Sequence, residues 1–207
     1  MAVDTGVAKL ALLDWRRRTF ALYAGVRAAE PEPAWRLWRA ERDRMFATHP
    51  QTPLDEGDRT RFSGLGYYDY DPAARVVAEV RETQPHQLDL DTSTGEPIRF
   101  RRFAEAVFEL HGTECALALY WLEGYAGGIF LPFGDATNGA GTYGGGRYLL
   151  DTAKGADLGA DGDGLVLDFN FAYNPSCAYA PWWTCPLPPN DNRMTQAVVA
   201  GERMPAW

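Results

Sequence analysis

The sequence of 207 residues is short of the residue types that mark several common classes of protein. It has three cysteines, three histidines and only two lysines, and its formal charge is −8. So few cysteines exclude a disulfide-built scaffold. The acidic balance argues against a broad nucleic-acid surface, which needs concentrated positive charge. No apolar run reaches membrane-spanning length, and the first residues lack the pattern of a signal peptide. We therefore expect a cytoplasmic protein that binds neither nucleic acid nor membrane.

Aromatic residues are plentiful instead, at 13% of the chain, with seven tryptophans. Rings at that density suit a thick core or the lining of a pocket. Residues 7–47 carry apolar side chains at helical spacing, and Trp35, Trp38 and Phe46 fall on one face, which we expect to pack into the core. Residues 1–50 are therefore predicted to form an N-terminal helical segment.

The period of the pattern changes after Pro53, where apolar and polar residues begin to alternate as they do in strands. A hairpin turn is predicted at residues 111–114, His-Gly-Thr-Glu. No helical stretch separates the successive short runs, which favours an antiparallel sheet curled into a barrel or sandwich. We predict a mainly β body over residues 51–207, with the N-terminal α-helices packed on it. The clearest strand candidates are residues 76–80, 87–91, 106–110 and 115–122.

The first segment that departs from the strand pattern is PFGDATNGAGTYGGGRYL, residues 132–149. Its glycine triplet lacks the spacing and the following helix of a dinucleotide-binding fingerprint. Consecutive glycines nevertheless expose backbone amides to an anion. Arg147 follows Gly145 and Gly146 directly and offers a forked donor to a carboxylate or phosphate. The alternative is a hairpin in which Arg147 pairs with Asp135, and the sequence supports both readings about equally.

The second segment is DFNFAYNPSCAYAPWWTCPLPPNDNRM, residues 168–194, which holds five prolines and four asparagines. The prolines restrict the unfolded chain and so fix the shape of the loop. Asp168 and Asn170 should project to the same side of a strand, because side chains alternate along it. That arrangement indicates a polar interior or a pocket. A rigid loop after it suits holding a ligand, or closing the end of a barrel.

Two further patterns resemble metal sites without meeting their requirements. Cys177 and Cys185 supply half of a zinc site, which His111 and Cys115 could complete only from a distant hairpin. Buried structural thiols are the interpretation we prefer. GADLGADGDGL, residues 155–165, lacks the ligand order of a calcium loop and is typical of a solvated hairpin turn. We therefore expect no metal.

Five segments stand out together: FSGLGYYDYDPAARV, LPFGDATNGAGTYGGGRYL, LDFNFAYNPSCAY, TCPLPPNDNRM and VVAGER. In order and spacing they resemble the bacterial family called domain of unknown function 1684, over about residues 35–203. This chain departs from the family pattern at Gly134, Phe171 and Ser176. The resemblance implies that the unusual segments form one unit on an antiparallel, barrel-like body. It supplies no reaction, cofactor or catalytic residue.

Two hypotheses from different classes follow. In the first, the protein binds a small polar or anionic metabolite without a cofactor, in a pocket between residues 132–149 and 168–194, with acid–base catalysis as an extension. In the second, the same polar groups form a satisfied network in a non-catalytic module that binds a ligand or partner. A flavin or haem barrel is a weaker third reading, because no histidine stands at a suggestive position.

The sequence permits a homodimer without requiring one. In the first hypothesis the ligand-binding residues are Arg147, Gly145, Gly146, Asn170, Asn174 and Asn192, and the catalytic residues are Asp135, Tyr143 and Asp168.

Overall fold

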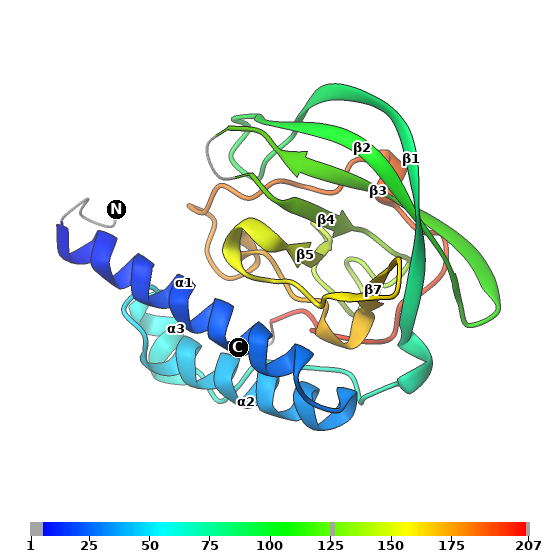
Figure 1. The fold of residues 1–207 in the computed structure, drawn as a ribbon. Helices are drawn as coiled ribbons and strands as arrows, with labels where there is room; N and C mark the ends of the chain where they lie inside the picture. The colour runs from blue at the N-terminus through cyan, green and yellow to red at the C-terminus, as the bar shows by residue number, and fades with distance from the viewer. Residues whose placement is uncertain (1–5, 125–126, 206–207) are drawn as a thin grey trace.

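The computed structural model describes residues 6–124 and 127–205. Its N-terminal part consists of α1 (Gly6–Arg27), α2 (Pro31–Thr48) and the short α3 (Glu56–Arg61). Helices α1 and α2 contact each other and lie along one side of the curled sheet (Figure 1). Proline at the first helical position and Glu32 in the first turn favour the start of α2. No helix in the described ranges is long and apolar enough to cross a membrane.

The described residues after α3 contribute one antiparallel sheet of seven strands, in the order β5-β4-β3-β2-β1-β7-β6. Because each strand is rotated relative to its neighbour, the sheet curls into a half-barrel (Figure 1). The prediction of a mainly β protein with helices packed on it is confirmed. The strands are β1 (Arg75–Leu90), β2 (Ile98–Leu110), β3 (Thr113–Leu122), β4 (Ile129–Phe133), β5 (Arg147–Asp151), β6 (Ala160–Asp161) and β7 (Gly164–Asp168).

Strand β1 passes without a break through two runs that were predicted as separate strands, residues 76–80 and 87–91. The register of its pairing with β2 shifts between Glu82 and His86, and Pro85 lies inside this irregularity. A bulge tolerates a proline because one residue there makes no ladder hydrogen bond. The single long strand is therefore two predicted strands joined by a bulge.

The hairpin between β2 and β3 lies where the sequence predicts it. Leu110 pairs with Thr113, and the two turn residues, His111 and Gly112, both have positive φ, at 49° and 77°. Positive φ at both central residues matches the right-handed twist of the flanking strands. The turn therefore lies within the predicted stretch but takes only two residues, because Thr113 and Glu114 already belong to β3.

The main core lies between the helices and the inner face of the sheet. Trp38 has no exposed surface, and its ring centroid lies 5.2 Å from that of Phe171. The indole Nε1 of Trp35 donates to the backbone oxygen of Asn170 at 3.1 Å. The predicted apolar face of α2 is thus buried, and it anchors the helix to the segment that follows β7.

One local prediction is wrong. Strand β7 ends at Asp168, and Phe169–Phe171 forms a turn of 3-10 helix. The Asp168 carboxylate caps this turn by accepting the backbone N–H of Asn170 at 3.0 Å. Asp168 and Asn170 therefore do not share one face of a strand, because capping by the aspartate competes with continuation of the ladder.

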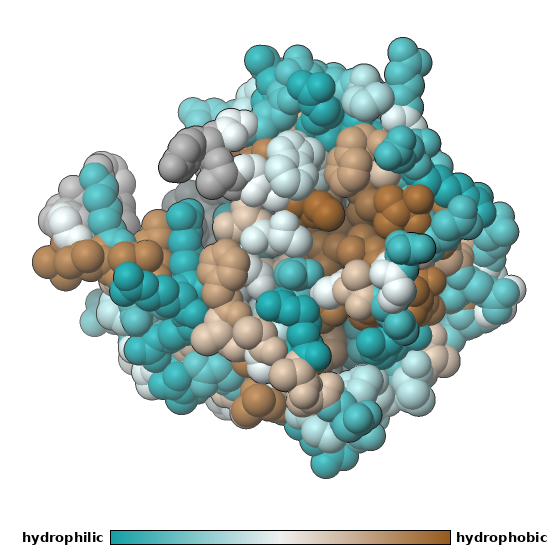
Figure 2. Space-filling model, viewed as in Figure 1, coloured by the Kyte–Doolittle hydropathy of each residue, from teal (hydrophilic) through white to brown (hydrophobic). Residues whose placement is uncertain are grey.

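The N-terminal end of α1 projects from the body and carries exposed apolar side chains. Val7 is 78% exposed and Leu10 is 67% exposed. The hydrophobic surface of this projecting end is visible in Figure 2. Further along α1, Leu22, Tyr23 and Val26 turn inward and are buried.

Candidate functional site

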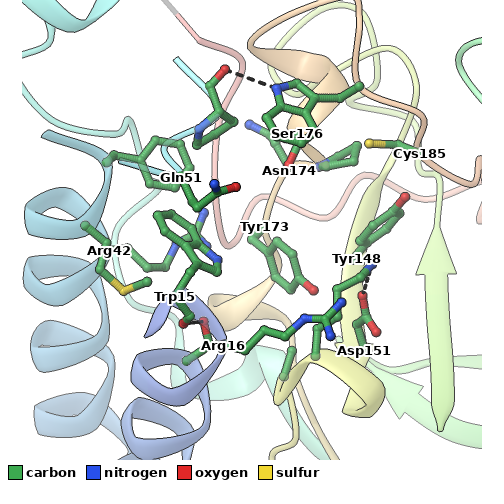
Figure 3. A pocket seen from close by; sticks show the side chains of 18 of the residues that line it. Trp15, Arg16, Arg42, Gln51, Tyr148, Asp151, Tyr173, Asn174, Ser176 and Cys185 are labelled. Carbon is green, nitrogen blue, oxygen red and sulfur yellow. Dashed lines mark hydrogen bonds and ion pairs between the residues drawn. The ribbon is translucent and has the colours of Figure 1, made fainter. Parts of the chain in front are cut away.

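A cavity of about 350 Å³ lies between α1 and α2 on one side and the proline-rich segment 173–186 on the other. We call it the helix–loop cavity (Figure 3). The helices contribute mainly aromatic and cationic side chains to its wall, and the end of β5 with the loop contributes tyrosines and polar groups. The lining residues include Trp15, Arg16, Tyr23, Trp38, Arg42, Tyr148, Asp151, Lys154, Tyr173, Asn174, Ser176, Tyr179, Trp183 and Cys185.

Backbone pairing holds the loop wall in place. The backbone N–H groups of Tyr148 and Tyr173 each donate to the other residue's carbonyl, at 2.8 and 3.0 Å. This bridge brings the two rings to the same wall, where their centroids lie 5.8 Å apart. Further along, the backbone oxygen of Cys185 accepts the Ser93 N–H at 3.0 Å. The loop therefore has fixed contacts at several points.

Three buried polar atoms on the cavity residues have no hydrogen-bond partner among the described residues: the Tyr23 hydroxyl, the Trp38 Nε1 and the Asn174 Oδ1. Burial raises the pKa of Tyr23 to about 12, while the nearby Trp38 N–H opposes that shift without reaching hydrogen-bond geometry. Buried polar groups are normally paired, so unpaired ones around a cavity point to an unseen ligand or water.

The charges around the cavity are largely compensated, with one exception. Arg42 donates to Glu202 at 2.7 Å, and Lys154 donates to Asp151 at 2.9 Å. Arg16 forms no ion pair with any described residue. It extends from α1 toward the middle of the cavity, in the direction of Asp151 (Figure 3). The cavity therefore carries one positive charge without a carboxylate partner among the described residues.

Glu202 ties the cavity to the C-terminal segment. Its carboxylate accepts the Arg42 guanidinium, the Asn174 backbone N–H at 3.0 Å and the Tyr179 hydroxyl. Burial raises the pKa of Glu202, and Arg42 opposes that shift. Three bonds to one buried carboxylate fix the helix and the loop relative to each other.

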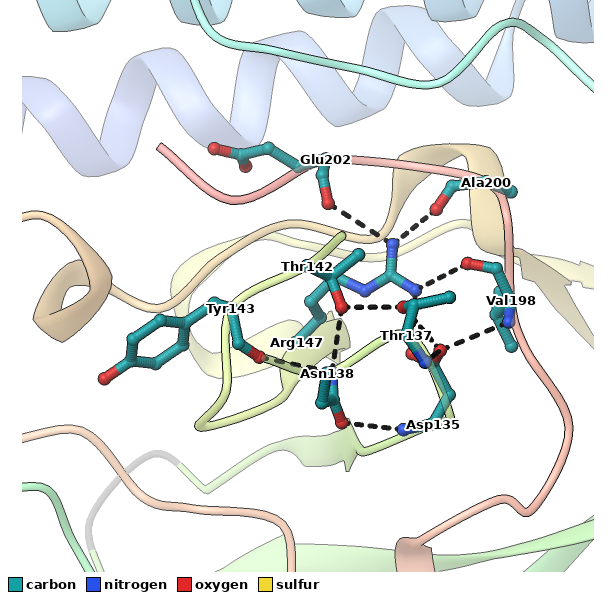
Figure 4. Close-up of polar contacts among 9 residues, drawn as sticks. All are labelled: Asp135, Thr137, Asn138, Thr142, Tyr143, Arg147, Val198, Ala200 and Glu202. Carbon is teal, nitrogen blue, oxygen red and sulfur yellow. Dashed lines mark hydrogen bonds and ion pairs between the residues drawn. The ribbon is translucent and has the colours of Figure 1, made fainter. Parts of the chain in front are cut away.

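Of the residues predicted from the sequence, Asn174 lies on the cavity wall, whereas Arg147 and Asp135 lie elsewhere. Arg147 is completely buried and pairs with Asp135 at 2.9 Å. Its guanidinium also donates to the backbone oxygens of Val198 at 3.0 Å and Glu202 at 3.3 Å, and to that of Ala200 (Figure 4). These contacts hold the C-terminal segment against β5.

The second oxygen of Asp135 is also occupied. It accepts the Thr137 backbone N–H at 2.8 Å, the Thr137 hydroxyl at 2.6 Å and the Val198 backbone N–H at 3.2 Å. Asp135 and Arg147 therefore form an ion pair, which was the alternative reading of residues 132–149 and fits the satisfied network of the second hypothesis. Every oxygen of this carboxylate has a protein partner.

The glycines before Arg147 meet close neighbours. A Cβ on Gly146 would lie 2.5 Å from Cγ of Pro188, and its φ is +84°. A Cβ on Gly145 would lie 2.4 Å from the Tyr143 ring. The Tyr143 hydroxyl donates to Sγ of Cys177 at 3.6 Å. Close packing and a left-handed turn therefore account for both glycines.

The three remaining predicted residues lie in two places. Asn192 is fully buried, and its side chain bonds the Ala118 N–H at 2.8 Å and the carbonyls of Ala118 and Pro132 at 3.0 and 2.7 Å. Asn170 donates to Asp168 Oδ1 at 2.8 Å. Asp168 lines a second cavity of about 280 Å³ beside Arg75, whose Nε lies 3.9 Å from the carboxylate. Burial raises the pKa of Asp168 to about 6.

Sequence reasoning missed the helical wall. Trp15, Thr19, Leu22 and Tyr23 lie on one face of α1 and line the cavity. Their spacing is helical, so the pattern itself was available. What it could not show is that a cavity separates part of this face from the loop opposite.

The structure does not assemble the zinc ligands considered above. In the described residues no group of three or more His, Cys, Asp or Glu side chains could hold a metal ion. His111 instead contacts Asp71, with 2.8 Å between Nε2 and Oδ2. Among the described residues, Cys177 and Cys185 therefore have no further zinc ligand beside them.

The fold and site define a half-barrel β protein with a cavity closed by N-terminal helices. Comparison with known proteins shows that the chain belongs to the family described as "Protein of unknown function (DUF1684)", whose sequence profile matches residues 60–203. Its bacterial origin stays a prediction.

A solved structure of an uncharacterised protein from Haloarcula marismortui, determined by NMR in solution, is similar to this chain. The two share 39% sequence identity with a TM-score of 0.61, and the match covers 83% of this chain and 93% of the other. No curated protein matches.

Proposed function

We propose that the protein binds a small anionic metabolite with a flat, partly apolar body in the helix–loop cavity. The observation that carries the proposal is the set of unpartnered polar atoms on Tyr23, Trp38 and Asn174 around an aromatic cavity. Of the seven buried side-chain polar atoms without a partner among the described residues, these three lie on the lining of one cavity, and buried polar groups are normally paired.

The size and composition of the cavity support this reading. Its volume of about 350 Å³ lies at the lower end of the range of pockets that hold small molecules, about 300–1,000 Å³. Such pockets are mostly apolar with a few placed polar groups. Trp15, Tyr148 and Tyr173 supply flat surfaces here, and the unpartnered atoms offer both donors and an acceptor.

The positive charge of Arg16 favours the binding of an anion. Arg16 carries the uncompensated charge, and its planar guanidinium matches a carboxylate or phosphate. Arg42 and Lys154 already have carboxylate partners, so they add little net charge. A ligand whose ring lies among the aromatic side chains would bring its acidic group to Arg16.

The test begins with a panel of aromatic carboxylates and phosphate esters, screened by the shift that each causes in the melting temperature. For the best compound, the dissociation constant is then measured by calorimetry. We expect Arg16→Ala to weaken binding by about fivefold to tenfold, because a partly exposed charge pair contributes about 1 kcal/mol.

Arg17→Ala is the matched control, since Arg17 is the next residue on the exposed side of α1 and does not line the cavity. It should bind the compound as tightly as the wild type. If no compound stabilises the protein, or if both variants weaken binding equally, the proposed site is wrong.

Acid–base catalysis at Asp168 is a second candidate. Its favouring observation is a buried carboxyl with a pKa of about 6, beside a cavity and with Oδ2 outside its capping bonds. A carboxyl tuned toward neutrality suits proton transfer. Carbon-13 NMR of the carboxyl would measure that pKa, and a value near 4 would remove the candidate.

A further inference from the structure

Two cysteines of the loop wall lie in direct contact. Cys177 belongs to the turn of 3-10 helix Ser176–Ala178, and Cys185 follows eight residues later. The Cys177 backbone N–H donates to Sγ of Cys185 at 3.3 Å. Both thiols are free. The prediction of buried thiols is confirmed for this pair, but their pairing was not foreseen.

One donor reaches the sulfur of Cys177, the Tyr143 hydroxyl, which lies 3.6 Å away. Donors aimed at a sulfur stabilise its thiolate, which is the reactive form of cysteine. Cys185 also lines the helix–loop cavity, so one sulfur of the pair faces that cavity.

We propose that Cys177 and Cys185 form a redox-active dithiol that reduces small-molecule disulfides, with Cys177 as the attacking thiolate and Cys185 as the resolving thiol. Thiol–disulfide exchange of this kind needs two sulfurs within reach and one of them ionised. The bond from the Cys177 backbone N–H to Sγ of Cys185 holds the two cysteines side by side, which meets the first condition, and the Tyr143 hydroxyl on Sγ of Cys177 supports the second.

The exchange balances in two steps. The Cys177 thiolate attacks one sulfur of the disulfide R–S–S–R, forms a mixed disulfide and expels one RS⁻. Cys185 then gives its proton to solvent and attacks Sγ of Cys177, which expels the second RS⁻. Two electrons pass from the dithiol to the small molecule, and the protein keeps a Cys177–Cys185 disulfide.

The acidities of the thiols agree with these roles. The neighbouring Cys185 thiol lowers the pKa of Cys177 to about 6, against the opposing effect of burial. The Cys177 thiol, together with burial, raises the pKa of Cys185. The first proton therefore leaves the pair easily and the second is retained. Burial raises the pKa of the third cysteine, Cys115, which is therefore an internal control.

The first experiment measures alkylation by iodoacetamide between pH 5 and 9, residue by residue, by peptide mass spectrometry. At pH 7 we expect Cys177 to react about tenfold faster than Cys115, because most of Cys177 and only a few per cent of an ordinary thiol is ionised. Its rate should level off above an inflection near pH 6. Cys185→Ser should move that inflection upward, and Cys115→Ser should leave it unchanged.

The second experiment treats the native protein with oxidised glutathione. The wild type and Cys115→Ser should lose two hydrogens and form the Cys177–Cys185 disulfide. Cys185→Ser should stop at one glutathionyl group on Cys177, because the resolving thiol is gone. Circular dichroism checks that each variant is folded, and the pH profile of the wild type needs no variant.

An inflection for Cys177 at or above pH 8, or equal rates for Cys177 and Cys115, would overturn the proposal. So would a wild type that glutathione leaves fully reduced. The proposal is independent of the anionic ligand, since the dithiol reactions require neither that ligand nor Arg16.

Discussion

Replacement of Arg147 by alanine tests whether this buried arginine holds the fold or a ligand. Its guanidinium has no exposed surface, pairs with Asp135 at 2.9 Å and donates to the carbonyls of Val198, Ala200 and Glu202. Alanine would leave the Asp135 charge buried without its counter-ion, and it would remove the donors that hold the C-terminal segment to β5.

The expected loss is large. Removing one partner of a buried ion pair costs about 3–5 kcal/mol, because the remaining charge stays desolvated. Carbonyls that lose a donor add to this where no other group reaches them. Domains of this kind are stable by about 5–15 kcal/mol in total. We therefore expect Arg147→Ala to lose at least about 4 kcal/mol of its free energy of unfolding.

The assay is urea unfolding followed by tryptophan fluorescence, to which the seven tryptophans are suited. The matched control is Arg101→Ala, whose ion pair with Glu123 lies at the surface. That variant should change stability by less than about 1 kcal/mol. If Arg147→Ala unfolds like the wild type but no longer binds a ligand, the structural argument is refuted and Arg147 is the anchor that the first hypothesis describes.

Two further predictions concern buried polar groups. Tyr23→Phe removes a hydroxyl that has no partner among the described residues, so urea unfolding should show a stability within about 1 kcal/mol of the wild type, or a gain. Calorimetry should show weaker ligand binding. A loss of stability above about 2 kcal/mol would mean that the hydroxyl is bonded in the folded protein. Burial raises the pKa of Asp168 to about 6, so its protonated form favours folding below about pH 4, and that contribution is lost as the pH rises through about 6. When the pH is raised from 4 to 7, the free energy of unfolding should therefore fall less in Asp168→Asn than in the wild type, by up to about 3 kcal/mol. If the urea midpoints of the two proteins change equally with pH, the raised pKa is contradicted.

The elements that could be predicted from the sequence are those whose burial follows a local period. The apolar face of α2 and the β2–β3 hairpin at His111–Gly112 are of this kind. The end of β7 is not, because the period of two continues through Phe169 while the Asp168 side chain caps a turn instead. The backbone N–H of Asn170 can bond either to the Asp168 side chain or to a neighbouring strand, and the spacing of apolar residues does not distinguish the two.

The candidate site was harder to predict for a different reason. Asp135 and Arg147 are twelve residues apart, and the sequence left their pairing open as one of two readings. The carbonyls at residues 198–202 decide between the ion pair and the ligand anchor, because they accept hydrogen bonds from the Arg147 guanidinium. The positions of backbone carbonyls cannot be predicted from residue types. Cys177 and Cys185 are a similar case, since only the folded loop brings the Cys177 backbone N–H to Sγ of Cys185.

The two walls of the helix–loop cavity differ in how they relate to the family. The family match covers residues 60–203, which include the loop wall with Tyr173 and Asn174. The helical wall, with Arg16, lies before residue 60. The loop wall is held by contacts that also complete the sheet, so changes there disturb the fold. Arg16 is exposed on α1 and forms no ion pair with a described residue, so a change there costs the fold little. The proposed site therefore predicts that family members with another residue at this position differ first in the charge of the ligand they bind.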